Sequence, residues 1–140
     1  MPNDLPSRQT TLTGVWHGAY SYVTLPWMPD NDFVAVLIDS GGVLSGTVHE
    51  AMRNSTGTVA DTEAAIQGDR QGTQVSFIKS YSGHLAGHRV FYDGVWDIAA
   101  DEIQGEWRIP VGMDAECGRF VMRRRRAKAK LQETLISETV

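Results

Sequence analysis

The sequence predicts an all-β fold, an eight-stranded antiparallel up-and-down β-barrel with a short C-terminal, partly helical tail. Three observations lead to this fold class. Apolar and polar residues alternate with a period of two over most of the chain. Turn sequences divide the chain into eight such segments. The connections between these segments alternate between long and short.

Eight strands account for the alternation. It is clearest in "EIQGEWRI", where Ile103, Trp107 and Ile109 share one face and charged or amide residues share the other. It is least regular in "TVADTEAAIQG", because the alanines and glutamate of this segment also suit a short helix. The expected strands are 12–23, 33–39, 43–50, 58–68, 73–81, 89–97, 102–109 and 117–125.

The connections predict that the sheet closes on itself. Long loops follow the first, third, fifth and seventh strands, and tight turns such as "DSGG" follow the second, fourth and sixth. Alternate connections of an antiparallel array lie at opposite ends, so all the long loops gather at one end. Closure removes the two exposed edges of such a sheet. We therefore expect a small barrel with a loop-rimmed mouth.

One domain is expected at 12–125, between a flexible N-terminus at 1–11 and a basic, partly helical tail at 126–140. Residues 1–122 contain seven Lys/Arg and fifteen Asp/Glu, a net charge of −8. Residues 123–140 contain six and two, a net charge of +4. Such a block can bind nucleic acid or an acidic membrane. Because no aromatic residue interleaves "RRRRAKAK" to stack on bases, we interpret it as a solvated segment and expect no nucleic-acid partner.

The sequence shows no feature of a membrane or secreted protein. No apolar run reaches the roughly 18 residues that span a membrane. The segment "MPNDLPSRQT" lacks the apolar part of a signal peptide, and the single cysteine, Cys117, excludes an internal disulfide. A cytoplasmic protein without a membrane partner is therefore expected. The oligomeric state stays open, with a homo-oligomer among the alternatives.

Three of the four tryptophans stand two residues after a glycine, in "GVW", "GVW" and "GEW". Residues two apart in a strand face the same way, so each glycine leaves space beside an indole. The interior of an eight-stranded barrel is narrow and needs that space. Trp16 and Trp96 are expected to fill the core near the tight-turn end. Trp107 lies nearer the loop end and is a candidate for ligand contact.

The segment "GVWHG" at 14–18 resembles the Gly-x-Trp signature of lipocalins and of the related avidin-type (calycin) barrels. The resemblance implies that Gly14 and Trp16 belong to the closed base of the barrel, and that Arg123 or Arg124 of the last strand packs over the indole. Secreted lipocalins usually carry a signal peptide and disulfides. The chain therefore looks more like an intracellular, lipocalin-like domain of bacteria. It lacks the biotin-contact pattern of the avidin group, so biotin is not expected.

The inward side chains define a candidate binding site near the mouth. Two sets of side chains on the third strand can face inward: Leu44, Val48 and Glu50, or Thr47 and His49. The first set is favoured because it is more apolar. Lys79 shares a face with Phe77, and a buried ammonium needs a partner. Glu50, a ligand carboxylate or water at the rim could supply it. The expected ligand-binding residues are Tyr20, Tyr22, Glu50, Phe77, Lys79, Tyr81, Tyr92 and Trp107.

No metal ion, other cofactor or catalytic residue is predicted. His84 and His88 have an H-x3-H spacing, but they lie in a Gly-rich loop without further ligands. His49 and Glu50 are adjacent in a strand and point to opposite faces, which argues against an acid–base pair. Cys117 is interpreted as structural.

These observations favour a binding module that holds a small, partly apolar ligand in the loop-end mouth, with an anionic head group as one candidate. One alternative is an enzyme of the isomerase, cyclase or lyase type that uses Tyr, Glu and Lys as acid–base groups in a dry pocket. Another is a protein-interaction domain that uses the tail or an outer patch. The fold alone does not choose among them.

Overall fold

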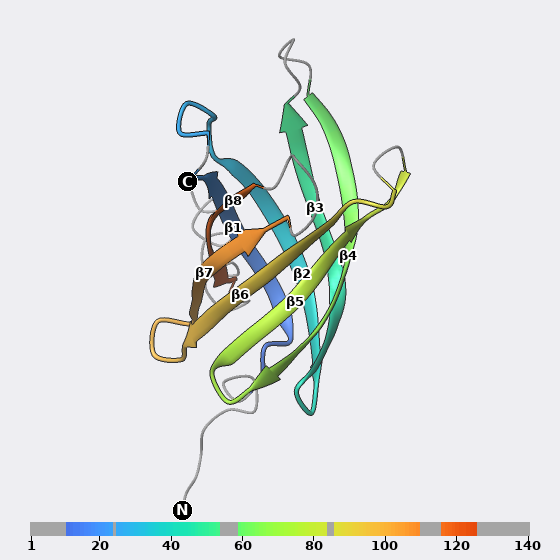
Figure 1. The fold of residues 1–140 in the computed structure, drawn as a ribbon. Coiled ribbons are helices and arrows are strands. Elements are labelled where there is room, and N and C mark those ends of the chain that lie inside the picture. The colour runs from blue at the N-terminus through green and yellow to red at the C-terminus, as the bar shows by residue number, and fades with distance from the viewer. Residues whose placement is uncertain (1–10, 24, 54–58, 84–85, 110–115, 126–140) are drawn as a thin grey trace, which may run out of the picture.

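The computed structural model describes residues 11–23, 25–53, 59–83, 86–109 and 116–125, which form a closed β-barrel (Figure 1). No helix among them is long and apolar enough to cross a membrane. The tail expected at 126–140 and the first ten residues lie outside the described residues. The strands are β1 (Gly14–Tyr22), β2 (Asn31–Ser40), β3 (Val43–Arg53), β4 (Val59–Gln71), β5 (Gln74–Tyr81), β6 (Arg89–Asp97), β7 (Glu102–Arg108) and β8 (Cys117–Arg124).

The strands follow one another around the barrel in chain order. Every neighbouring pair is antiparallel, and β1 pairs with β8 from Trp16 opposite Arg124 to Tyr22 opposite Gly118. The predicted eight-stranded up-and-down barrel is therefore confirmed. The segment that also suited a short helix is strand β4, because its backbone pairs with β3 on one side and with β5 on the other.

The tight turns lie at one end of the barrel and need unusual backbone conformations. Gly41 and Gly42 have φ values of 62° and 93° between β2 and β3. A Cβ atom at Gly42 would lie 2.7 Å from the carbonyl oxygen of Arg70, so only glycine fits there. The Gly42 N–H donates a 2.9 Å hydrogen bond to Asp39 Oδ1. This turn therefore holds the β2–β3 hairpin against β4.

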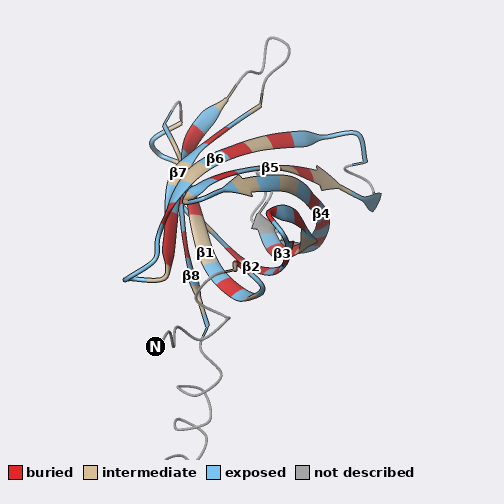
Figure 2. Ribbon diagram, turned by 90° about the horizontal axis from the view of Figure 1, so that it is seen from below, coloured by how far each residue is buried: buried red, intermediate tan, exposed pale blue. Residues whose placement is uncertain are grey.

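Alternation along each strand separates a buried interior from an exposed outside, visible as bands in Figure 2. On β2, Phe33, Ala35 and Leu37 are buried, and on β3 the apolar set that includes Glu50 faces inward while His49 is exposed. The predicted orientation of β3 is thus confirmed. Apolar side chains fill the barrel toward the tight-turn end: Leu12, Trp16, Leu37, Leu44, Ile66, Val75, Trp96, Ile103 and Met122.

The tight-turn end is closed by Trp16 and one of the two arginines expected beside it. The guanidinium carbon of Arg124 lies 4.9 Å from the centre of the Trp16 ring, and its Nη2 lies 2.8 Å from Asp101 Oδ1. A Cβ atom at Gly14 would lie 2.9 Å from Arg124 Cδ, so the glycine leaves room for this side chain. The Arg123 side chain is 76% exposed and pairs with Glu102 instead. Arg124 therefore makes the cation–indole contact.

Candidate functional site

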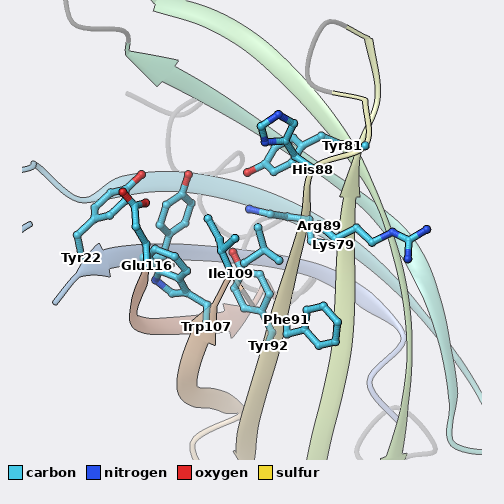
Figure 3. A pocket seen from close by; sticks show the side chains of 13 residues that line it. Tyr22, Lys79, Tyr81, His88, Arg89, Phe91, Tyr92, Trp107, Ile109 and Glu116 are labelled. Atoms are coloured by element: carbon cyan, nitrogen blue, oxygen red, sulfur yellow. The ribbon is translucent and has the colours of Figure 1, made fainter. Parts of the chain in front are cut away.

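The opposite end of the barrel contains a cavity of about 510 Å³ between β1, β5, β6 and β7 (Figure 3). Aromatic and aliphatic side chains form most of its wall, and a few polar groups converge within it. Its lining residues are Tyr20, Tyr22, Lys79, Tyr81, Gly87, His88, Arg89, Val90, Phe91, Tyr92, Trp107, Ile109 and Glu116.

Lys79 lies at the floor of this cavity. The inward alternation of β5 continues from Val75 and Phe77 to Lys79, so the register of the strand buries the lysine. Only 2% of its side chain is exposed. Its Nζ lies 3.3 Å from Oε2 of Glu50, whose side chain is 1% exposed and comes from β3, two strands away. The ammonium therefore meets its counter-ion inside the barrel.

Hydroxyl groups complete the polar surroundings of Glu50. Tyr81 and Tyr20 each donate a hydrogen bond to Glu50 Oε1, the second at 3.4 Å. Asn31 Nδ2 donates to the Tyr20 hydroxyl at 2.8 Å, and the hydroxyl of Thr62 donates to the Glu50 backbone carbonyl at 3.1 Å. Within the described part of the chain, no buried side-chain nitrogen or oxygen lacks a partner. The buried carboxylate is thus fully hydrogen-bonded, which its burial requires.

Three tyrosine rings surround the Lys79 ammonium. Its nitrogen lies 4.8 Å from the ring centres of Tyr20 and Tyr81 and 5.2 Å from that of Tyr92. The negative faces of aromatic rings attract a cation at such distances. The rings also keep water away from the Lys79–Glu50 pair, so the pair interacts in a medium of low polarity.

Burial changes the acid–base behaviour of this cluster. It lowers the pKa of Lys79 below its ordinary value, although the Glu50 carboxylate acts in the opposite direction. It raises the pKa values of Tyr20, Tyr81 and Tyr92, and the negative charge of Glu50 adds to that rise. The tyrosines therefore remain protonated hydrogen-bond donors at neutral pH. Lys79 releases its proton more readily than an exposed lysine does.

Trp107 forms the opposite wall of the cavity with two tyrosines of β1. Its ring meets Tyr22 edge-on at 5.3 Å and Tyr20 edge-on at 5.8 Å between ring centres. Its Nε1 donates a 2.9 Å hydrogen bond to the Ser21 carbonyl oxygen, across β8. A Cβ atom at Gly118 would lie 2.5 Å from that Nε1, so the glycine of β8 makes room for the indole. These contacts therefore hold the Trp107 indole in one orientation.

Six of the eight residues predicted to bind a ligand lie in the cavity wall: Tyr20, Tyr22, Lys79, Tyr81, Tyr92 and Trp107. Glu50 does not reach the wall, because Tyr20, Tyr81 and Lys79 cover it. Phe77 lies below the floor, where its ring stacks on Tyr92 with centres 4.8 Å apart. Beneath Lys79 only a void of about 10 Å³ remains. The side chains of Lys79 and Tyr92 thus separate Phe77 from the cavity.

Sequence reasoning missed several lining residues at the rim. Ile109 shares the face of Trp107 in the alternation, so this signal was present in the sequence. His88 was interpreted as a loop residue, and its partner in the H-x3-H motif, His84, lies outside the described residues. Arg89 and Glu116 line the mouth from strand ends, where alternation no longer predicts direction. Among the described residues, no three His, Cys, Asp or Glu side chains are grouped to hold a metal ion.

No protein-family model and no curated protein sequence matches this chain. The chemistry of the cavity is therefore the basis for inferring what the protein does.

Proposed function

We propose that this protein binds a small, partly apolar molecule in the cavity at the mouth of its barrel. The observation that carries the proposal is a cavity of about 510 Å³ with an aromatic and aliphatic wall and a polar cluster at its floor. Small-molecule sites are typically clefts of about 300–1,000 Å³ with such a wall and a few orienting polar groups.

The charges in the cavity favour a ligand with an uncharged polar head. The Lys79 charge is already balanced by Glu50 at 3.3 Å. An anionic head group would add a net negative charge to a buried site, which is unfavourable without a further cation. At the rim, Arg89 and Glu116 carry opposite charges and favour neither sign. A carbonyl or hydroxyl oxygen near Lys79 and Tyr81, with an apolar body along Trp107, fits these groups best.

We also propose that the chain is a lipocalin-like member of the calycin-type barrels. The support is the cation–indole contact at the closed end, where Arg124 of β8 lies over Trp16 of "GVWHG". The resemblance to the Gly-x-Trp signature implies such a contact from the last strand. The interaction-domain alternative rests mainly on the tail at 126–140, which lies outside the described residues.

Tryptophan fluorescence tests the proposed binding. Titration with a panel of small aliphatic and aromatic alcohols, ketones and carboxylates is expected to give a saturable change for at least one neutral compound, because Trp107 lines the cavity. The change is expected to disappear in Trp107→Phe and to persist in Trp27→Phe, a matched variant whose indole is 74% exposed. Calorimetry with the same compounds separates loss of binding from loss of signal. The absence of saturable binding by the wild type across the panel contradicts the proposal.

A further inference from the structure

The lysines of this chain are distributed unusually. There are three, Lys79, Lys128 and Lys130, so Lys79 is the single lysine among residues 1–125. Lysine is among the residues least often buried, yet Lys79 is 2% exposed. The other Lys/Arg positions of the barrel are arginines, which do not lose their protons in proteins. The one side-chain amine of the barrel therefore lies at the floor of the proposed binding cavity.

The position of Lys79 suits covalent chemistry rather than charge recognition. Figure 3 shows its nitrogen directed toward the space between the tyrosines and Trp107. The Lys79 ammonium attracts an anionic ligand only weakly, because the buried Glu50 carboxylate at 3.3 Å already neutralises its charge. A lysine amine is nucleophilic only after a base removes the proton of its ammonium form. Glu50 is in position to be that base. Burial also lowers the pKa of Lys79, in the direction that frees its lone pair.

We propose that Lys79 forms a reversible imine with an aldehyde or ketone that occupies the cavity. This inference rests on the proposed function and names its ligand class. In the proposed complex the carbonyl carbon of the ligand lies next to Lys79 Nζ. The carbonyl oxygen of the ligand faces the Tyr81 hydroxyl, which also contacts Glu50. An apolar carbonyl compound suits the aromatic wall, and an aldehyde without charge suits a floor whose charges already cancel.

The first half of the reaction forms a carbon–nitrogen bond. The Lys79 ammonium transfers a proton to Glu50 Oε2, which leaves a neutral amine and a neutral carboxyl group. The nitrogen lone pair attacks the carbonyl carbon, and the π electrons move to the carbonyl oxygen. That oxygen takes a proton from Tyr81, which recovers one from Glu50. The product is a carbinolamine that is still protonated on nitrogen, beside a Glu50 carboxylate.

The second half expels water. Glu50 removes the proton from the carbinolamine nitrogen, whose lone pair then forms the carbon–nitrogen double bond. The hydroxyl group leaves as water after it takes a proton from Glu50 through Tyr81. The sum is one carbonyl compound and one ammonium giving one iminium and one water, without oxidant or reductant. The Glu50 carboxylate then balances the charge of the iminium, as it balanced that of Lys79.

Reductive trapping tests this inference. The full chain is incubated with trans-cinnamaldehyde and cyanoborohydride, and intact mass followed by peptide mapping locates the resulting secondary amine. We expect one addition, at Lys79, formed faster than at Lys128 or Lys130, because burial lowers the pKa of Lys79 and so raises its free-amine fraction at neutral pH. Labelling of Lys128, Lys130 or the N-terminal amine without preference for Lys79 overturns the inference.

Two variants identify the cause of the reactivity. Lys79→Met is expected to abolish the fast addition. Arg89→Lys adds a second amine to the same cavity, at an exposed rim position without a buried carboxylate beside it. The introduced amine is expected to react more slowly than Lys79, since no buried carboxylate lies beside it to take up its proton. Equal rates would mean that proximity alone drives the addition and would contradict the role given to Glu50.

Cinnamyl alcohol separates this inference from the proposed function, because it has nearly the same shape and cannot form an imine. Binding of the alcohol, detected by tryptophan fluorescence, together with absent trapping of the aldehyde would overturn the imine and leave the binding function intact. Trapping at Lys79 that the alcohol competes away supports both. If neither compound binds or reacts, both proposals fail for this ligand class.

Discussion

At the scale of single residues, the buried Lys79–Glu50 pair determines the charge balance at the floor of the cavity. Taking two charges out of water is costly, and the pair recovers that cost only through close contact and additional hydrogen bonds. The 3.3 Å contact, two tyrosine donors to the carboxylate and three aromatic rings around the ammonium supply these. Removal of one partner leaves the other buried and uncompensated. Removal of both is far milder.

Glu50→Gln is expected to lower the free energy of unfolding by about 3 kcal/mol, because Lys79 then lacks a buried counter-ion. Lys79→Met combined with Glu50→Gln is expected to recover most of that loss, since no buried charge remains. Urea unfolding at neutral pH measures both. Arg123→Ala is the matched control, and its pair with Glu102 is 76% exposed on the arginine side, so a change below about 1 kcal/mol is expected. Additive losses in the double variant would contradict a coupled pair.

Residue patterns in the sequence identified most of this cluster but not its geometry. The period of two placed Tyr20, Lys79 and Tyr92 on inward faces, since alternation depends only on local backbone structure. It also placed Phe77 among the ligand contacts, although the residues above it cover it. Which inward residue forms the floor of the cavity depends on the lengths of side chains from several strands. The sequence of one strand does not contain this information.

At the scale of elements, the turn between β2 and β3 is tied to two other parts of the barrel by one carboxylate. Asp39 accepts hydrogen bonds from the backbone of Leu12 at 2.8 Å and of Gly42 at 2.9 Å, and it pairs with Arg70 of β4 at 2.7 Å. Its side chain is fully buried. Burial acts to raise the pKa of Asp39, but the bonds from Arg70, Leu12 and Gly42 outweigh it and the net pKa is lowered. The ionised form therefore stabilises the folded state.

Asp39→Asn is expected to lower the free energy of unfolding by about 2–4 kcal/mol at pH 7, because the amide cannot replace the charged acceptor. The wild type is expected to lose this stability as pH falls below 3.8, the ordinary aspartate pKa, since the unfolded state then takes up a proton before the folded state does. The variant should lack this part of the acid dependence. Urea unfolding between pH 7 and pH 2 measures it, and identical acid profiles for both proteins would contradict it.

Most elements could be predicted, because strand periodicity and turn residues are local signals. β4 was the ambiguous segment, since the alanines and glutamate of "TVADTEAAIQG" also suit a short helix. Its pairing with β3 and β5 decided the matter, and such pairing is a long-range property. The rim residues Arg89 and Glu116 were missed for a related reason. At strand ends the direction of a side chain follows the loop rather than the pleat.

At the scale of the whole molecule, the closed base and the proposed binding cavity lie at opposite ends of the barrel. The closed end contains Trp16, Trp96 and Arg124, whose guanidinium carbon lies 4.9 Å and 5.7 Å from the two indole ring centres. Arg124 also donates to the carbonyl oxygens of Thr11 and Thr13 at 2.8 Å and 3.0 Å. None of these residues lines the cavity at the other end.

Arg124→Ala is therefore expected to lower the free energy of unfolding by about 3 kcal/mol, because it removes a mostly buried ion pair with Asp101 and a cation above Trp16. Ligand affinity measured well below the unfolding temperature is expected to stay within about twofold of the wild type, since the cavity is untouched. Thermal unfolding and calorimetry measure the two quantities. A loss of affinity equal in size to the loss of stability would show that the two ends are coupled.

The sequence by itself determined the strand count, the antiparallel order, the alternation of faces and the closed cylinder, because these follow from local periodicity and from the need to remove sheet edges. The tertiary structure alone decided that Glu50 meets Lys79, that Arg124 rather than Arg123 covers Trp16, and how deep the cavity extends. Those facts depend on distances between side chains far apart in the chain. Such distances are set by the register and curvature of the whole barrel, and no short segment contains them.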